Sequence, residues 1–319
     1  MGRRPRAVSI APVTWRDGVH LTGTPIWCDA RRRRDICFVS SADRVGRTGH
    51  GQLIGSPITL ALLGAKGDGH LAVPLRQRFT LGTLRLELIP SGRGLGAAAL
   101  HVDAVGRTVL HAGPVRTVAS SWYEAAEVRA CDALVIDAPL GELHHELEPI
   151  EDVVGRVVEW TREQLAAGLP TVVVVDSVLD GIEVATRLLA EGVPVAAQKP
   201  LRDAAARVAG LATVPTLRAP GREPSVLIRI EGERARVIDR EVRALVSYRA
   251  IDVAQVDASF AASFAWPFVA GRTQLLAWIE QTRAREIFVT GASADAIAEK
   301  LGARARVIGP PRQMALFAI

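Results

Sequence analysis

Residues 36–51, ICFVSSADRVGRTGHG, come nearest in this chain to a catalytic motif. An apolar run typical of a strand leads into a polar loop with Ser41, Asp43, Arg44 and, further on, His50. Imidazoles and carboxylates are the usual ligands of catalytic divalent metals. Only Asp43 and the distant His50 could act as ligands here, and one carboxylate does not hold a divalent ion against water. The loop therefore lacks the ligands that a catalytic divalent metal needs.

All seven histidines lie at or before residue 145. A relocated zinc or manganese site built from His50, His111 and Asp43 stays open as an alternative. Serine-hydrolase chemistry would need a Gly-x-Ser-x-Gly turn, which the sequence lacks. Ser40 and Ser41 are accordingly interpreted as polar loop residues.

Two further segments could bind phosphate. Residues 91–99, SGRGLGAAA, have glycines at 92, 94 and 96, which does not match Gly-x-Gly-x-x-Gly, and no Walker motif lysine follows. A tight turn is the expectation there. The run Arg31, Arg32, Arg33 and Arg34 is either a solvated turn or a patch that contacts phosphate or a partner. A phosphate-contacting patch would also include Arg44, Arg47 and Arg93.

The composition permits nucleic-acid binding without establishing it. The net charge is +5, and 36 of the 39 basic residues are arginine, which binds phosphate bidentately. Cys28, Cys37 and Cys131 lack CxxC spacing, which favours buried thiols over a disulfide or a zinc site. No apolar run approaches the roughly 20 residues that cross a bilayer, and the first residues contain no apolar signal core. A cytoplasmic location without a membrane partner is expected.

The elements that must position these residues change character along the chain. The first 140 residues predict short strands separated by turns, with one helix at SPITLALLG, where Ser56 suits the N-cap and Pro57 the first helical position. From residue 149, helical spacing alternates with short buried strands such as PTVVVVDS. This alternation predicts an α/β fold with a doubly wound parallel sheet. We expect the aromatic run 264–268, FAWPF, to be core; an exposed partner anchor is the alternative.

The order of these segments resembles that of the metallo-β-lactamase-fold nucleases of the β-CASP group. Within this group it is most similar to the bacterial exonuclease-like proteins associated with DNA ligase or helicase. These proteins are related to the endonuclease that processes messenger-RNA 3′ ends. GVHLTGTPIWCDARRRRDICFVSSAD resembles the family's opening hairpin and the strand before its histidine motif. Two later family segments are similar to CDALVIDAPLG and VVVVDSVLDGIEVATRLL. The last family motif is similar to LLAWIEQTRAREIFVTG. The resemblance covers essentially the whole chain.

The resemblance implies an αββα metallo-β-lactamase sandwich with an inserted β-CASP domain that has a Rossmann-like parallel sheet. The implied division is residues 1–147 for the first part of the sandwich, 148–255 for the β-CASP-like domain, and 256–319 for a segment that returns to complete the sandwich.

The resemblance also implies where metal ligands would stand, and this chain lacks them. The family's histidine motif falls on Ser41, Asp43, Val45 and Gly46, its next histidine on Arg93, and its bridging aspartate on Pro114. The late Asp-His pair falls near Phe268 and Val269, and the final histidine on Gly291. Asp29 and Asp137 match family positions that do not bind metal. We therefore expect a vestigial pocket made by Asp29, Ser41, Asp43, Arg93, Pro114, Asp137 and Gly291, in which Arg93 pairs with Asp43, Asp29 or Asp137.

These expectations lead to a functional hypothesis. The chain would be an inactive nuclease homologue, a pseudoenzyme without catalytic residues, metal or cofactor, that binds nucleic acid or protein as a scaffold in DNA or RNA processing or repair. Its expected partner is an active nuclease, helicase or ligase. An active metal-dependent phosphodiesterase or exonuclease with a relocated site is the first alternative. A stand-alone nucleic-acid-binding protein is the second.

Overall fold

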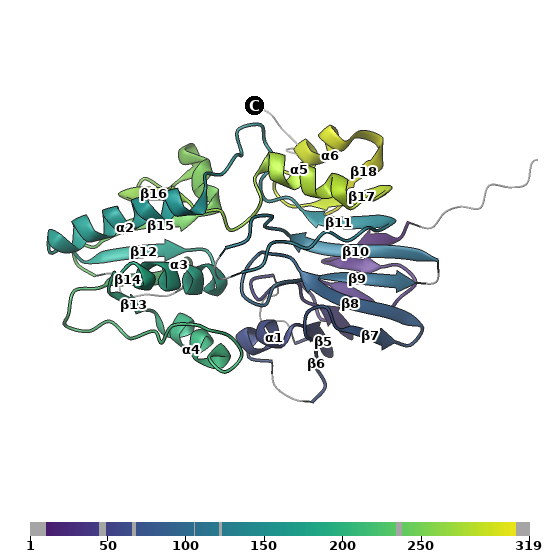
Figure 1. Ribbon diagram of the computed structural model, residues 1–319, viewed down its shortest axis with the longest axis horizontal. Helices are drawn as coiled ribbons and strands as arrows, with labels where there is room; N and C mark the ends of the chain where they lie inside the picture. Colours follow the sequence, from purple (N-terminus) through teal and green to yellow (C-terminus); the bar gives the residue numbers. More distant parts are fainter. Residues whose placement is uncertain are drawn as a thin grey trace, which may run out of the picture.

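The computed structural model describes residues 11–44, 49–65, 68–104, 106–120, 123–233 and 238–310. The chain is a mixed α/β protein with three sheets (Figure 1). Within the described residues, none of the helices combines the length and the apolar character needed to cross a membrane.

Two of the sheets lie face to face. Sheet A is mixed and contains, in spatial order, β1 (Val13–Trp15), β2 (Val19–Leu21), β3 (Ile26–Cys28), β4 (Ile36–Phe38), β5 (Gln52–Gly55) and β6 (Leu71–Ala72). Sheet B contains, in spatial order, β18 (Ala305–Val307), β17 (Glu286–Thr290), β11 (Ala133–Asp137), β10 (Arg107–Pro114), β9 (Ala98–Ala104), β8 (Leu84–Pro90) and β7 (Arg78–Leu81). Strands β10, β11, β17 and β18 run parallel to one another, so their carboxyl ends share one edge of sheet B.

Alternating side chains of both sheets fill the space between them. Phe38 and Ile54 of sheet A and Leu88, Leu100 and Phe288 of sheet B are 0–2% exposed and belong to one apolar cluster. Because successive strand residues point to opposite faces, one face of each sheet can enter this core. Cys28, Cys37 and Cys131 are buried free thiols, which confirms the expectation for the cysteines.

Helices cover the outer faces of the two sheets. Helices α5 (Arg272–Gln281) and α6 (Ala294–Leu301) pack on sheet B over β10, β11 and β17. Helix α1 (Pro57–Leu63) packs on sheet A. The capping predicted for α1 is confirmed, since Ser56 Oγ accepts from Thr59 N at 3.0 Å and Pro57 is the first helical residue. We call sheets A and B with these three helices the two-sheet unit.

Sheet C forms the second unit. It is entirely parallel, in the order β13 (Val195–Ala197), β14 (Val226–Ile230), β12 (Thr171–Val175), β15 (Val242–Ser247) and β16 (Ala262–Ala265). Helices α2 (Ile150–Ala166), α3 (Val178–Ala190) and α4 (Lys199–Val208) pack against it in one apolar cluster. The predicted strand–helix alternation is confirmed. We call sheet C with these helices the single-sheet unit, which occupies the left half of Figure 1.

The boundary between the units differs at one point from the prediction. Residue 255 was expected to end the second domain, but β16 pairs with β15 in sheet C, and the chain rejoins sheet B only at β17. Strand β16 is thus an edge strand of sheet C. No α-helix lies in the described residues between β15 and β16, so the strand–helix alternation did not indicate that β16 belongs to this sheet. Trp266 and Phe268, directly after β16, are 0% exposed, so these two aromatic side chains are core, as expected.

Candidate functional site

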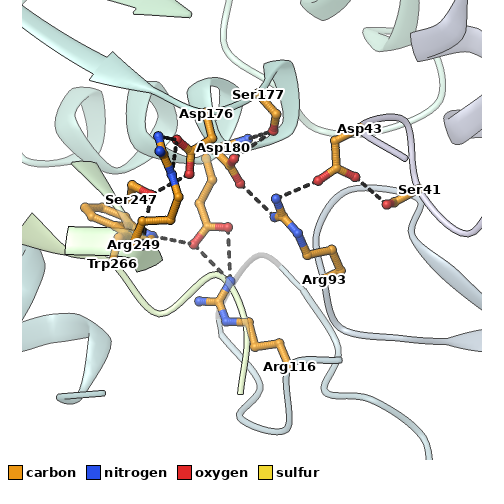
Figure 2. Close-up of polar contacts among 11 residues, drawn as sticks. Ser41, Asp43, Arg93, Arg116, Asp176, Ser177, Asp180, Ser247, Arg249 and Trp266 are labelled. Atoms are coloured by element: carbon orange, nitrogen blue, oxygen red, sulfur yellow. Dashed lines mark hydrogen bonds and ion pairs between the residues drawn. The ribbon is translucent and has the colours of Figure 1, made fainter. Parts of the chain in front are cut away.

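The junction of the two units is built around Arg93, which lies in the loop between β8 and β9. Its side chain is only 4% exposed and bridges the units (Figure 2). Nη2 donates to Asp43 Oδ2 of the two-sheet unit at 2.7 Å, and Nη1 donates to Asp180 Oδ1 of α3, also at 2.7 Å. The predicted pairing with Asp43 is present. Asp180, 87 residues away in sequence, was not foreseen as a partner.

The protonation of these groups follows from burial and charge. Burial would lower the pKa of Arg93, but the two carboxylates outweigh it and raise that pKa above its usual value. Burial also acts to raise the pKa of Asp43, which Arg93 and a hydrogen bond from Ser41 reverse, so that its pKa lies below the usual value. For Asp180 burial prevails, and its pKa rises to about 6. Arg93 is thus a fixed cation between one firmly ionised carboxylate and one that titrates near pH 6.

Asp29 joins sheet A to sheet B. Its Oδ1 accepts from Ser40 N at 2.9 Å, while its Oδ2 accepts from Ser40 Oγ at 2.7 Å and lies 3.0 Å from His111 Nε2. Burial acts to raise the pKa of Asp29, but the bond from His111 and the nearby positive charges hold it below the usual value. Serine and histidine both contact the same carboxylate and no bond joins them, so this trio is not arranged as a nucleophilic triad.

Asp137 ends strand β11 at the carboxyl edge of sheet B. Arg44 Nη1 lies 3.1 Å from its Oδ2, and Thr290 Oγ1 donates to its Oδ1 at 2.8 Å. The charge of Asp137 raises the pKa of Arg44. Gly291 follows Thr290 with φ +102°, and a Cβ there would approach Asp137 Oδ1 to 2.8 Å, so the close packing requires glycine.

Among the remaining family-implied ligand positions, those that the structure describes have no metal-binding geometry either. Pro114 pairs with Asp137 across β10 and β11. Phe268 and Val269 are buried, and the Arg93 guanidinium lies 5.6 Å from the Phe268 ring centroid. Ser41 donates its hydroxyl to Asp43. Val45 and Gly46 lie outside the described residues.

A second buried arginine contacts α3 beside the first. Arg116 Nη1 lies 3.0 Å from both carboxylate oxygens of Glu183, and Trp266 Nε1 donates to Glu183 Oε1 at 3.1 Å (Figure 2). Arg116 is 4% exposed and Glu183 2%. An uncompensated charge at this depth would be costly, so each group depends on the other. Sequence reasoning missed this pair.

A third group lies at the carboxyl edge of sheet C. Asp176 accepts from the Ser247 hydroxyl and from Arg249 (Figure 2). Arg249 Nη2 also donates to Glu231. Because β12, β14 and β15 run parallel, residues that follow them meet at one edge. The polar side chains at the carboxyl edge of sheet C are therefore paired with one another.

The alternative of a relocated metal site built from His50, His111 and Asp43 is wrong, because these side chains do not have the geometry of a shared site. His50 Nδ1 lies 3.2 Å from Arg34 N, His111 contacts Asp29, and Asp43 is committed to Arg93. Three different partners hold the three side chains, which do not converge on a common point.

In the described part of the chain, the group of side chains close enough to share an ion is His144, His145 and Asp252. His145 Nδ1 faces the backbone N–H groups of Gly141 and Glu142, at 3.0 and 3.1 Å, and must accept from them. Its proton is then on Nε2, which donates to Asp252 Oδ1 at 3.1 Å. A metal at Nε2 would force a proton onto Nδ1 against two donors. This cluster does not fit a metal ion.

The arginine run forms an exposed turn. Arg31, Arg32 and Arg33 are exposed, and Arg32 pairs with Asp17 at 3.1 Å. The fourth, Arg34, stacks on Trp27, with its guanidinium carbon 3.8 Å from the ring centroid. Arg47 lies outside the described residues. Arg93 does not join this surface, because it is buried in the junction.

Compared with known proteins, the chain matches no protein-family model and no curated protein sequence. The site is therefore interpreted from its own geometry.

Proposed function

We propose that this chain is a catalytically inactive homologue of the metallo-β-lactamase-fold β-CASP nucleases, and that it works as a binding subunit in a DNA- or RNA-processing assembly. One observation carries the proposal. Arg93 stands buried between Asp43 and Asp180, at a position where the resemblance implies a histidine ligand. Two sheets facing each other and a parallel sheet inserted between β11 and β17 agree with the family's architecture.

The chemistry of the junction supports the loss of hydrolysis. Metal-assisted hydrolysis needs carboxylates or imidazoles with free lone pairs and an open position for water. Asp43 is neutralised by Arg93, Asp137 by Arg44, and Asp29 is held by Ser40 and His111. A cation brought to these carboxylates would have to displace guanidinium groups that already compensate them.

The exposed arginine turn supports a role in binding nucleic acid. Arg32 and Arg33 are solvent-exposed guanidinium groups on the same turn, and such groups contact phosphates without reading sequence. The partner in the assembly would be an active nuclease, a helicase or a ligase, which would supply the chemistry that this chain lacks.

The inactive state is tested by assaying nuclease activity on single- and double-stranded DNA and RNA with added Mn²⁺ or Zn²⁺, alongside the metal content of the purified protein. We expect no activity and less than stoichiometric metal. Activity that depends on the metal and disappears in Asp43→Ala would contradict the proposal. Asp239→Ala, at an exposed position, is the matched control.

The binding role is tested by fluorescence anisotropy with labelled single-stranded oligonucleotides over a range of salt. Arg32→Ala/Arg33→Ala should weaken binding and reduce the salt slope by about one for each phosphate that the variant no longer binds. Arg156→Ala on α2 is the control, because it removes another exposed arginine elsewhere. Binding that is absent or independent of salt would end the nucleic-acid part of the proposal. Affinity purification from the native host that recovers no nuclease, helicase or ligase would end the assembly part.

A further inference from the structure

A cavity of about 570 Å³ lies at the carboxyl ends of β11 and β17. Asp137, Thr290 and Gly291 line it from sheet B, and Tyr248 lines it from the carboxyl end of sheet C. Ligand sites in parallel sheets form outside the carboxyl ends of the strands, because the connecting loops diverge there. Its volume falls within the roughly 300–1,000 Å³ of small-molecule sites.

The cavity wall offers positive charge. Arg44 and Arg31 both line it. Arg44 uses Nη1 on Asp137 and its Nε is buried, but the side chain is 31% exposed, so part of the guanidinium can face a ligand. Both carboxylate oxygens of Asp137 are already engaged, by Arg44 and Thr290, so this acid does not repel an anion as a bare carboxylate would. The remaining acid in the wall, Asp295, lies in the first turn of α6.

The rest of the wall adds aromatic surface. Ala294 and Asp295 of the first turn of α6 also line the cavity, and Ala294 N already donates to Gly291 O at 3.3 Å. Trp15 and Tyr248 add two aromatic side chains to the wall, which give a planar ring apolar surface.

The buried ion pairs limit the size of an occupant. Arg93 lies close enough to both Arg44 and Tyr248 for its charge to influence their pKa values. Its bonds to Asp43 and Asp180 join the two units beside the cavity. A polymer could not run between the units at this point without breaking them, whereas a small molecule could enter from solvent.

We propose that this cavity binds a small phosphate-bearing molecule with a planar ring, of about the size of a nucleoside monophosphate. The phosphate would be held by Arg44 and Arg31, and the ring would lie against Trp15 and Tyr248. This binding role goes beyond the proposed scaffold function and does not depend on the arginine turn residues used to test that function.

Isothermal titration calorimetry on the full chain tests the proposal with adenosine 5′-monophosphate, inorganic phosphate and adenosine. We expect the monophosphate to bind with a Kd of about 1 mM or tighter and adenosine about tenfold more weakly, since it lacks the charge-assisted bonds. Arg31→Ala should weaken monophosphate binding about tenfold. Arg156→Ala removes an exposed guanidinium on α2, outside the cavity, and should leave the Kd unchanged.

A second variant blocks the space without removing charge. Ala292 is exposed and lines the cavity, so Ala292→Trp should fill it and abolish monophosphate binding while thermal unfolding stays as in the wild type. The proposal is overturned if the monophosphate does not bind, if adenosine binds equally well, or if Ala292→Trp binds as the wild type does. A nucleic-acid affinity that survives any of these outcomes would leave the scaffold proposal intact.

Discussion

At the scale of single residues, the junction between the two units depends on the guanidinium of Arg93, which compensates two buried carboxylates. The interpretation of Arg93 as a cation in a vacated ligand position came from the resemblance, and its pairing with Asp43 is present in the structure. Its second partner could not be located by proximity in sequence. The sequence feature that could have indicated this partner lies in α3. There Asp180, Glu183 and Arg187 recur at helical spacing in a segment that is otherwise apolar. Charged residues on one stripe of a buried helix require compensating charges from another element.

Asp180 should give the protein an unusual pH dependence. Burial raises its pKa from 3.8 to about 6 in the folded chain, so between roughly pH 4 and pH 6 the folded state holds a proton that the unfolded state has lost. The contribution of Asp180 to stability should therefore fall as pH rises through this window, by up to about 3 kcal/mol, and stay level above it. Asp29 and Asp43, whose pKa values are lowered, act in the opposite sense only below about pH 4. His50 and His101, whose pKa values burial lowers from 6.5, act in the opposite sense within the window, so the Asp180 contribution is read from the difference between the wild type and Asp180→Asn.

The measurement is the free energy of unfolding in urea at several pH values from 4.5 to 7. Asp180→Asn should remove the Asp180 contribution from the profile in this window. Asp239→Asn changes the charge equally at an exposed position and should keep the wild-type profile. Parallel profiles for the wild type and Asp180→Asn would show that Asp180 does not titrate there.

At the scale of elements, local signals identified helices and strands well. Helix α1 was predicted with its N-cap because Ser-Pro followed by an apolar run is a local pattern. The alternation from α2 to β15 was likewise predictable, since buried parallel strands give short continuous apolar runs. Strand β16 was misassigned to the return segment because it follows β15 without a crossover helix. Which sheet an edge strand joins depends on tertiary packing that sequence periodicity does not contain.

Ser56 should stabilise the protein more than its place at the end of a short helix suggests. Its Oγ accepts from Thr59 N at 3.0 Å and donates to Gly96 O at 2.6 Å, which ties α1 to the loop that carries Arg93. Ser56→Ala should lower the free energy of unfolding by about 1–2 kcal/mol. Ser293 at α6 is the matched control, because it makes no cap bond and its hydroxyl donates only one long bond, to Pro139 O at 3.4 Å, so Ser293→Ala should cost less than Ser56→Ala. Equal losses for the two variants in denaturant unfolding would refute the role assigned to the Ser56 cap.

At the scale of the whole molecule, the two units are joined by buried charge as well as by apolar contact. Arg93 and Arg116 extend from loops of the two-sheet unit to Asp180 and Glu183 of α3. Leu62 of α1 also belongs to the apolar cluster of the single-sheet unit. Such an interface should make the two units unfold together, because separating them would break both ion pairs and expose the apolar surface between the units.

Removing both guanidinium groups should therefore uncouple the units. In Arg93→Met/Arg116→Met, Asp180 and Glu183 keep their burial without their cations, which costs about 3–5 kcal/mol for each broken pair. The single-sheet unit has its own apolar cluster and should survive the separation. Calorimetry should then show two transitions where the wild type shows one, and small-angle scattering should give a larger radius of gyration.

Arg156→Met is the control, because it breaks an ion pair with Glu148 in which both side chains are about half exposed, and such pairs contribute little. It should keep one transition and the wild-type radius. If the double variant also unfolded in one transition with an unchanged radius, apolar contact alone would join the units. The buried arginines would then fix the orientation of the junction without holding it together.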